Sequence, residues 1–548
     1  MELKRLTSNN RWMKVVSLSF IIFHLSFSGV AAQTPAFPGA EGHGRYATGG
    51  RGGQVVHVTN LNDSGTGSFR EAVSDNSKKI VVFDVGGVIA LKSNVNIGAN
   101  TTIMGQTAPS PGITLRYYTV NPAGNNIIMR FIRIRRGSEK DVNDGADAST
   151  ARHYTSMMLD HCSFSWSIDE VASFYDNNNF TMQWCTIGES LNNAGHNKGA
   201  HGYGGIWGGK LASFHHNLIL HVNNRSPRFN GVRPSVNDRH VDNEFVNNVV
   251  YNWGGHNSIY GGECDQTLGS DVYNRTFMIN NYYRPGPCTK AAGGNRHFVS
   301  ASAEKESELG QWYLRGNKFE LSSKWAGTSS IWSDEVLKKV NADNYYGFAT
   351  GSNDLGFNLY RAGTIPLNQA TADKVIMKEI PYALSGMSFD ESADEAFERV
   401  TKQAGATKGK TSGIIDSPYD ITLQSHDEFA ALDEATKTEI DVTCYPRLQG
   451  DSYDCQVLDT DGDGLPDAYE TEVGLNPNDA ADGQTLTTSG YSNLELFLNG
   501  VADGQIDATK YTRRQAVALM NGFNAVVGEG ETYTTVQAAI DAAPGDGT

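Results

Sequence analysis

Short segments rich in β-branched and aromatic residues recur along this chain from about Ile80 onward, and this repetition constrains the fold more than any other feature. They include IVVFDVGGVIAL, NIIMRFIRIR, SMMLDHCSFSW, FTMQWCTI, HVDNEFVNNVVYN and TFMINNYYRP. The segments follow one another at intervals of roughly 22 to 36 residues, which is the range of repeat lengths in solenoids. A β-sandwich would show shorter, hairpin-linked strands with closer turn signals. The pattern therefore predicts an all-β solenoid of parallel coils.

Asparagine stands at the end of many of these segments. The positions are Asn217, Asn247, Asn248, Asn280, Asn281 and Asn317. Asparagine tolerates left-handed backbone, and its side chain can form hydrogen bonds to an adjacent turn. We expect these residues to turn the chain and to link successive coils.

The formal net charge of the chain is -16. A protein that binds nucleic acid needs a basic surface for the phosphates, so nucleic acid is not an expected partner. A polyanionic substrate would have to bind in a local cationic groove or through a metal ion.

Residues 1–32 have the features of an export signal. Basic residues between Lys4 and Lys14 precede an apolar run from Val15 to Val30, and the small residues Ala31 and Ala32 follow it. The run is too short, and too closely followed by polar sequence, for a membrane span. We expect cleavage after residue 32, a secreted protein that is extracellular or periplasmic, and no membrane span in the mature chain.

The six cysteines are compatible with disulfides in an exported chain but do not require them. Cys444 and Cys455 form the most plausible pair, because only a short loop separates them. Cys162 and Cys185 lie about one coil apart, so they can stack as buried thiols as easily as they can bond. The other two could pair across a loop insertion.

Three motifs carry a resemblance to a known family: LDHCSFSWSIDE, HNKGAHGYGGIWGG and HHNLILHVNNRSPRF. Together with AFPGAEGHGRYATGGRGG and VTNLNDSGTGSFREAV, they resemble polysaccharide lyase family one, the pectate lyases. The resemblance runs from Pro35 to about Ala406. It implies a right-handed parallel β-helix, here expected over residues 33–406 with a carboxyl-terminal capping segment. It also implies that the partner is polygalacturonate or pectin, cleaved by calcium-assisted β-elimination.

The resemblance implies a calcium site. Asp160 in LDH and Asp169 in SIDE correspond to calcium ligands of the family, and Glu170 is the neighbouring candidate. Ca²⁺ is a hard cation that takes oxygen ligands, which these carboxylates supply. A cation beside the carboxylate of a galacturonate ring would disperse the charge that develops when C5 loses its proton.

The resemblance also assigns three basic residues. Arg225 in RSPR corresponds to the catalytic arginine, and Lys198 in HNKG and Arg228 correspond to residues that bind substrate carboxylates. Arginine normally stays protonated far above neutral pH, so a role of Arg225 as general base predicts an alkaline optimum of activity. The basic segment Arg133–Arg136 either lines the groove or forms a solvated face.

Other polar residues near these motifs have two interpretations each. Asp144 and Asp147 in NDGAD could be metal ligands, although acidic loops flanked by glycine are more often turns. His161, His215 and His216 are more often residues stacked between coils than ligands.

Two other functions remain to be considered. A β-helical polygalacturonase-type hydrolase would need a pair of carboxylates, and Asp169 and Glu170 would face opposite sides of a strand. A non-catalytic polysaccharide-binding adhesin would have no need of Lys198 and Arg225 in their contexts. Ultraviolet absorbance separates the three, because only a lyase forms a conjugated double bond.

An amphipathic helix is expected in SADEAFERVTKQAGA, packed over or beside the end of the solenoid, before a linker over residues 407–450. The segment DTDGDGLPDAYE then matches the pattern of a calcium-binding loop. The expected ligands are Asp459, Asp461, Asp463, Asp467 and Glu470. With its neighbours this loop resembles the short EF-hand-like modules of secreted bacterial polysaccharide enzymes, which predicts a structural calcium ion in a module over residues 451–503.

Residues 504–548 resemble the opening strand and helix of pectin methylesterases. Only the beginning of such a domain is present, so no esterase site is expected in this sequence. The expectation is that the natural protein is, or descends from, a longer one in which a pectin methylesterase follows the lyase, and that the lyase acts as a monomer.

Overall fold

The computed structural model describes residues 33–515 with interruptions. Within that range the residues outside the description are 110–111, 139, 141–144, 193, 255–257, 287–288, 290–296, 321–337, 340, 343, 345–355, 362–364, 366–367, 381–384 and 407–452. The expected export signal, the expected linker and residues 516–548 of the methylesterase-like segment therefore lie outside the described residues. Internal contacts divide the chain after Thr34, and the account below concerns the unit Pro35–Thr548.

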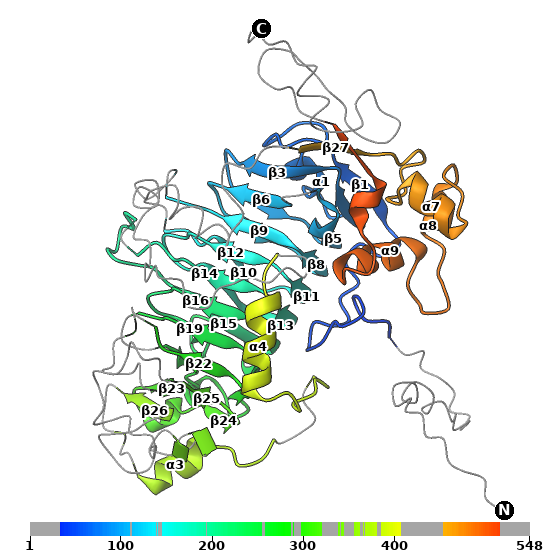
Figure 1. The fold of residues 1–548 in the computed structure, drawn as a ribbon. Coiled ribbons are helices and arrows are strands. Elements are labelled where there is room, and N and C mark those ends of the chain that lie inside the picture. Colours follow the sequence, from blue (N-terminus) through cyan, green and yellow to red (C-terminus); the bar gives the residue numbers. More distant parts are fainter. Residues whose placement is uncertain are drawn as a thin grey trace, which may run out of the picture. The chain divides into compact units, whose positions relative to one another are not determined.

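Most described strands belong to one large sheet (Figure 1). Its strands are β1 (Gln54–Val58), β2 (Lys79–Phe83), β5 (Thr101–Met104), β8 (Ile127–Arg130), β10 (Ser149–Ala151), β11 (Thr155–Asp160), β13 (Ala172–Gln183), β15 (Ile206–His215), β17 (Arg228–Phe229), β18 (His240–Val246), β20 (Tyr260–Gly261), β21 (Tyr273–Ile279), β23 (His297–Ala303), β24 (Gln311–Arg315) and β26 (Gly356–Arg361). Every pairing inside this sheet is parallel.

A second sheet runs beside it. It contains β3 (Val85–Ala90), β6 (Ile113–Arg116), β9 (Ile132–Arg135), β12 (Ser163–Ser165), β14 (Thr186–Gly188), β16 (Leu218–Leu220), β19 (Val249–Tyr251), β22 (Tyr282–Arg284), β25 (Lys318–Phe319), β27 (Tyr453–Val457) and β28 (Thr512–Gln515). β4 (Val95–Ile97) and β7 (Val120–Pro122) form a small separate pair. The two sheets alternate along the chain, as expected when each coil contributes a strand to both.

Helices are few in the described part of the chain. The α-helices are α1 (Phe69–Ala72), α3 (Gln369–Val375), α4 (Ala393–Gln403), α7 (Asp467–Val473), α8 (Ala480–Gly483) and α9 (Asn493–Ala502). The 3-10 turns are η1 (Gly105–Thr107), η2 (Gln266–Leu268), η3 (Glu306–Glu308) and η5 (Ala508–Tyr511). None of the described helices combines the length and the apolar composition that a bilayer-crossing helix requires.

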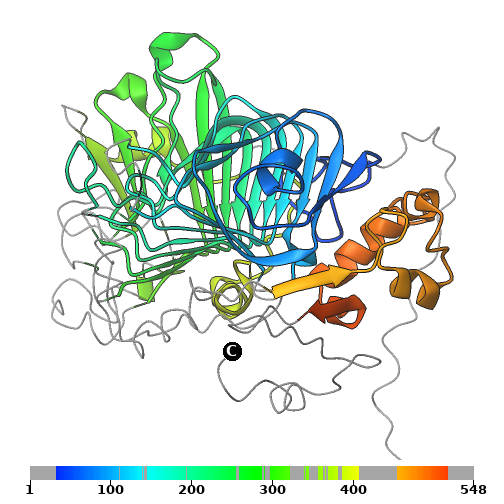
Figure 2. The same ribbon diagram turned by 90° about the horizontal axis from the view of Figure 1, so that it is seen from above.

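The spacing of the coils agrees with the sequence periodicity. Lys79 pairs with Thr101, 22 residues later, and Thr276 pairs with Trp312, 36 residues later. Seen from above, successive coils superpose (Figure 2). The predicted all-β, right-handed parallel β-helix is confirmed.

Two long strands divide the large sheet into two faces. The first residues of β13 pair with β10, and its later residues pair with β11. In the same way, the first residues of β15 pair with β17, and its later residues pair with β18. The path β17, β20, β23, β26 continues the first of these faces. We call it the site face, and it also includes β10 and the beginnings of β13 and β15.

Inward-pointing apolar residues fill the solenoid. Ala151, Phe174, Trp207 and Phe229 pair in register across four strands of the site face, and all four are buried. Side chains alternate along a strand, so the residues on either side of this row point outward. The packing of the interior thereby fixes which side chains of the site face reach the surface.

The asparagine pairs have two separate tasks. Asn247 and Asn280, the first members of their pairs, have φ of 53°, so each turns the chain in the left-handed region. The second members form a buried hydrogen-bonded ladder, in which Asn248 Nδ2 donates to Asn281 Oδ1 (3.1 Å) and Asn281 Nδ2 donates to Asn317 Oδ1 (2.8 Å). Both parts of the expectation are confirmed.

Aromatic rings stack outside the core as well. His161 lies between Phe131 and Trp184, with ring centroids 4.9 Å and 5.9 Å away, and Trp184 stacks on His216 at 4.3 Å. His161 and His216 are therefore stacked between coils, as expected. Arg135 and Arg136 are fully buried, so the basic segment is not a solvated face.

The predicted amphipathic helix is α4, which begins after a capping box at Ser392. Its Ala393, Val400 and Ala404 pack on Leu218 and Val249 of the second sheet. The helix therefore lies beside the coils rather than over their end (Figure 2).

The segment after residue 452 packs against the first coils. Leu465, Leu494 and Phe497 share an apolar cluster with Ile80 and Val82 of β2. Further contacts are the ion pair between Arg51 and Glu495 (2.6 Å) and the antiparallel pairing of β27 with β3 and with β28. The expected boundary at residue 504 falls inside this arrangement, because β28 follows it.

The described cysteines with free thiols are Cys162, Cys185 and Cys264, and all three are buried. Cys162 donates its backbone N–H to Cys185 Sγ (3.4 Å), so these two are stacked thiols rather than a bridge. Cys288 and Cys444 lie outside the described residues.

We expect Asn281→Ala to lower the free energy of unfolding by about 2–3 kcal/mol, because it removes buried hydrogen bonds that Asn281 Nδ2 donates to the Phe245 carbonyl and that Asn281 Oδ1 accepts from the backbone N–H and Nδ2 of Asn248. Denaturant unfolding followed by fluorescence measures the change. Asn96→Ala, at an exposed position, is the control and should change stability by less than about 0.5 kcal/mol. Equal effects of the two substitutions would contradict a structural role of the ladder.

Candidate active site

Three carboxylates meet at the edge where the chain enters the site face. Asp147 precedes β10, and Asp169 and Glu170 precede β13, the next strand in register. One oxygen from each lies within 4.8 Å of the others. Asp169 and Glu170 are buried, and Asp169 Oδ1 is buried without a hydrogen-bond partner. Burial and the charge of Asp169 raise the pKa of Asp147 well above its usual value.

This donor set fits a hard divalent cation. Carboxylate oxygens are the ligands that calcium prefers, and a cation would offset the repulsion and the burial that raise the pKa of Asp147. Asp144, the other acidic residue considered in this loop, lies outside the described residues.

Asp160, a calcium ligand according to the family resemblance, is not grouped with these three carboxylates. The chain passes through β12 between Asp160 and Asp169, so the two lie on different sides of a coil. Arg130 Nε contacts Asp160 Oδ2 at 2.7 Å, Gln183 Nε2 donates to Oδ1 at 2.8 Å, and the side chain is fully buried. Although burial opposes the charged form, the charges of His161 and Arg130 keep the pKa of Asp160 below its usual range. Asp160 is therefore a structural anchor.

Arg225 reaches back across the site to the carboxylate group. It forms an ion pair with Glu170, its guanidinium carbon lies 4.3 Å from the centre of the Tyr203 ring, and its Nε donates to Tyr260 Oη at 3.2 Å. The backbone of Arg225 is in the left-handed region (φ 58°), where the chain leaves the coil for β17. The structure thus joins Arg225, Asp169 and Glu170 in one site.

Arg228 opens β17 on the same face. Its Nη2 lies 2.5 Å from Glu263 Oε1, and the Arg233 Nε lies 3.9 Å from the same oxygen. The guanidinium carbon of Arg228 is 5.7 Å from the centre of the Tyr260 ring, which also contacts Arg225. Arg228 and Arg225 are therefore neighbours through Tyr260.

Lys198 lies in the loop between β14 and β15, with an exposed side chain. Its backbone N–H donates to His196 Nδ1 at 3.0 Å. Burial and the charge of Lys198 lower the pKa of His201, and the charge of Asp169 opposes this shift. Lys198 is therefore a neighbour of the two histidines of this loop.

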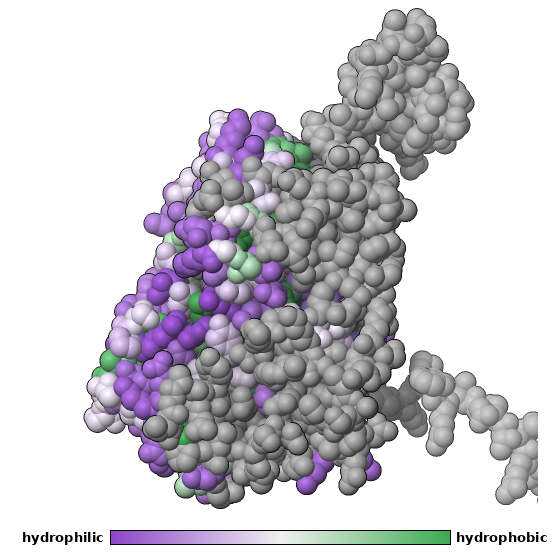
Figure 3. Space-filling model, turned by 90° about the vertical axis from the view of Figure 1, so that its left-hand side faces the viewer, coloured by the Kyte–Doolittle hydropathy of each residue, from purple (hydrophilic) through white to green (hydrophobic). Residues whose placement is uncertain are grey.

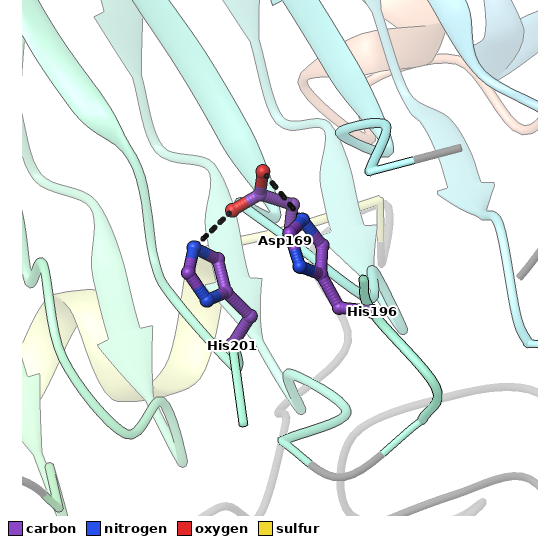
Figure 4. A group of neighbouring side chains, drawn as sticks. All are labelled: Asp169, His196 and His201. Atoms are coloured by element: carbon purple, nitrogen blue, oxygen red, sulfur yellow. Dashed lines mark ion pairs between the residues drawn. The ribbon is translucent and has the colours of Figure 1, made fainter. Parts of the chain in front are cut away.

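Two histidines of this loop face Asp169 (Figure 4). His196 Nε2 lies 3.4 Å from Oδ2, and His201 Nε2 lies 3.6 Å from Oδ1. The two rings are stacked, with centroids 4.1 Å apart and planes inclined by 5°, so their lone pairs lie in parallel planes and do not converge on one ion. Because His196 Nδ1 accepts a hydrogen bond, the proton of the neutral ring is on Nε2, facing Asp169. The two histidines therefore flank both oxygens of the Asp169 carboxylate.

The relative orientation of the Asp169 and Glu170 side chains also differs from the sequence expectation. They were expected to face opposite sides of a strand, but both lie before β13 begins, where side-chain alternation does not apply. Their carboxylates consequently turn to the same group.

The carboxyl-terminal loop gathers two overlapping acidic groups. Asp459, Asp461 and Asp463 form one, and Asp463 and Glu470 form the other with Asp482. Glu470 is fully buried and neither of its oxygens has a hydrogen-bond partner. Burial and the charge of Asp463 raise the pKa of Glu470 to about 8. A bound cation would offset both the burial of the Glu470 carboxylate and its repulsion by Asp463, so this cluster also fits calcium.

Asp467 is not part of either acidic group, in contrast to the loop pattern. Its two oxygens accept hydrogen bonds from Thr460 N (2.7 Å) and Thr460 Oγ1 (2.6 Å), because it is the first residue of α7 and closes the loop. Asp482, in α8, stands with Glu470 instead.

The sequence analysis favours a turn at Asp147 over a metal ligand. It does not single out the other residues that the structure adds to these sites, which are His196, His201, Tyr203, Tyr260 and Asp482. Tyr203 stands in HGYGG, between glycines that indicate close backbone approach, and Asp482 stands in NDAADG, directly after the calcium loop. The glycines indicate a constrained backbone at Tyr203, and the sequence shows that Asp482 is acidic. Neither signal predicts which side chains these two residues contact in the folded protein.

The chain has extensive relatives among fungal proteins. A probable pectate lyase C of Neosartorya fischeri is 34% identical over 495 residues, which cover 89% of this chain and 98% of that protein. A probable pectate lyase C of Aspergillus flavus is 34% identical over 492 residues, which cover 88% of this chain and 97% of that protein. No protein-family model matches the sequence.

Solved structures give a weaker likeness. The major allergen of cedar pollen has a TM-score of 0.44 and 15% identity, covering 67% of this chain and 92% of the allergen. At this TM-score the likeness adds nothing to what the strands of this chain show. The fungal relatives match at 34% identity over nearly their whole length, and no such match arises from the fold alone. This chain belongs to the pectate lyase family.

Proposed function

We propose that this chain is a pectate lyase that cleaves α-1,4-linked polygalacturonate by calcium-assisted β-elimination and releases 4,5-unsaturated oligogalacturonides. One observation carries the proposal: the group formed by Asp147, Asp169 and Glu170 lies against Arg225, through the ion pair with Glu170. Removal of a weakly acidic proton beside a carboxylate needs a stabilising cation and a base close together.

Asp147, Asp169 and Glu170 would hold the calcium ion. Bound there, calcium would supply positive charge to the substrate carboxylate and so stabilise the carbanion at C5. His196 and His201 contribute by holding the Asp169 carboxylate in one orientation.

Arg225 is the proposed general base. It takes the proton from C5, the electron pair of that bond forms the C4–C5 double bond, and the glycosidic oxygen at C4 leaves and is protonated. Arg228 and Lys198 bind neighbouring carboxylates of the polymer, Arg228 with the planar fork that suits a carboxylate. Arg228 is already paired with Glu263, so substrate binds there in competition with that carboxylate.

Among the described residues that reach the surface in Figure 3, hydrophilic ones predominate and apolar ones are scattered. A hydrolase would need an acid and a second carboxylate about 5–10 Å apart on either side of the scissile bond. One oxygen atom from each of the three carboxylates lies within 4.8 Å of the others, an arrangement that suits a shared cation.

We further propose that residues 1–32 direct export and are removed, that the enzyme acts outside the cytoplasm as a monomer, and that a second calcium site is structural. Its ligands would be Asp459, Asp461, Asp463, Glu470 and Asp482. The contact of His57 Nε2 with Asp459 Oδ2 (3.4 Å) connects this loop to β1, so calcium there would steady the first coils.

The assignment is tested by ultraviolet absorbance of the conjugated double bond, with polygalacturonate as substrate. We expect absorbance to rise with calcium and to stop with a chelator, because the proposed reaction needs calcium at the carboxylate group to bind the substrate carboxylate. New reducing ends without absorbance would show a hydrolase, and full activity in chelator would exclude the calcium step.

A pair of substitutions tests the proposed ligand set. Asp147→Asn should raise the calcium concentration for half-maximal activity at least about tenfold, since a metal-site substitution typically costs that much affinity. Asp160→Asn should leave this concentration unchanged but destabilise the fold by about 3 kcal/mol, because Arg130 loses its buried partner. The reverse pattern would return Asp160 to the ligand set.

The carboxyl-terminal site is tested by melting temperature. Asp482→Asn should raise about tenfold the calcium concentration that gives half of the calcium-dependent increase in melting temperature. Asp479→Asn is the matched control, because Asp479 caps α8 and does not join the acidic group. It should change the melting temperature little, both with and without calcium, because asparagine caps a helix about as well as aspartate does. If both variants respond to calcium as the wild type does, Asp482 is not a ligand.

A further inference from the structure

The position of Tyr203 between the two halves of the candidate site leads beyond the proposed function. Tyr203 forms isolated parallel bridges with Glu170 on one side and with Asn224, the residue before Arg225, on the other. Its N–H donates to the Asp169 carbonyl (3.2 Å), its carbonyl accepts from Val171 N–H (2.9 Å), and the next residue, Gly204, donates to the Asn224 carbonyl (2.8 Å). Tyr203 is therefore fixed between the segment of the calcium ligands and the segment of the base.

This register dictates the path of the Arg225 side chain. Glu170 and Asn224 flank Tyr203, so a side chain that starts beside Asn224 and ends at the Glu170 carboxylate must cross residue 203. The guanidinium carbon of Arg225 lies 4.3 Å from the centre of the Tyr203 ring, which matches a cation resting on an aromatic face. The ring is thus a platform under Arg225.

The platform is itself supported from behind. The His201 ring lies 4.4 Å from the Tyr203 ring, the His196 ring lies 4.1 Å from that of His201, and both histidines face Asp169. The column His196, His201, Tyr203 therefore connects the Asp169 carboxylate with the Arg225 guanidinium. One loop, between β14 and β15, supplies all three rings.

The backbone around Tyr203 leaves it little freedom. A Cβ at Gly204 would come within 2.3 Å of the Arg225 carbonyl oxygen, and one at Gly205 within 1.8 Å of the Ala172 carbonyl oxygen. Only glycine permits the two neighbouring segments to approach so closely. The sequence YGG therefore places the ring at a fixed height between them.

We propose that Tyr203 is the positioning residue of Arg225, and that the face of its ring, rather than its hydroxyl, holds the guanidinium beside the calcium ligands. This inference rests on the proposed function, since it assigns Arg225 to proton removal. A displacement of a catalytic group by about 1 Å can cost a hundredfold in rate, so the platform is expected to act on turnover.

The test compares variants of Tyr203 in the calcium-loaded full-length enzyme. Tyr203→Leu should lower kcat about 10- to 100-fold with KM within about threefold, because the ring positions a group for the transition state and does not bind the polymer. Tyr203→Phe, which keeps the ring, should stay within about threefold of the wild-type kcat. Should the leucine variant fail to fold, Tyr203→Met removes the ring with a side chain that packs more adaptably.

The matched control is a similar arrangement away from the site. The guanidinium carbon of Arg275 lies 3.9 Å from the centre of the Tyr273 ring, and its Nε pairs with Asp242 at 2.8 Å. Tyr273→Leu should therefore lower the melting temperature as Tyr203→Leu does and leave kcat unchanged. A kcat for Tyr203→Leu within threefold of the wild type overturns the proposal, as does an equal loss in Tyr203→Phe.

A crystal structure of Tyr203→Leu separates this inference from the proposed function. The Arg225 guanidinium should leave the position beside Glu170, whether or not the enzyme is a lyase. If it stays, the platform role is wrong even where the lyase activity is established. If the wild-type enzyme forms no unsaturated product but Arg225 moves in the variant, the positioning role stands and the reaction assigned to Arg225 does not.

Discussion

Hydrogen bonds between adjacent coils determine the geometry of the active site. Tyr203 N–H binds the Asp169 carbonyl at 3.2 Å, and Gly205 N–H binds the Arg225 carbonyl at 2.9 Å, so three distant stretches of sequence lie one coil apart in a fixed order. A slip of one residue would turn each side chain to the other face. The asparagine ladder and the buried row that includes Phe174 and Trp207 oppose such a slip, because both would lose their partners.

Sequence reasoning was accurate where a pattern is local or periodic. The coil spacing, the left-handed asparagines at Asn247 and Asn280, and the helix after Ser392 all follow from such patterns, and the structure bears them out. It failed where the role of a residue depends on the direction in which its side chain points. Asp160 ends the apolar segment SMMLD and Asp147 stands in the acidic loop NDGAD, but only the packed structure shows that Arg130 pairs with Asp160 and that Asp147 faces Asp169.

The site residues divide in the same way. The motif around Arg225 and the pair Asp169 and Glu170 could be selected from the sequence, and the structure joins them. Tyr203 and Asp482 could not, since their importance lies in neighbours supplied by other coils or by another helix. Contacts of this kind have no local signature, because the spacing between coils varies with each insertion.

The pairing of β27 with β3 has a consequence for the surface of the folded protein. A solenoid ends in a strand with unpaired backbone donors and acceptors, which is a template for association with other chains. In the second sheet that strand is β3, and β27 and β28 continue the sheet beyond it in the antiparallel direction. A reversed, two-stranded border cannot extend the parallel coil pattern of a neighbouring molecule. The strands β27 and β28, which lie before and after the acidic loop in the sequence, thus border the second sheet with a pattern that differs from that of the coils.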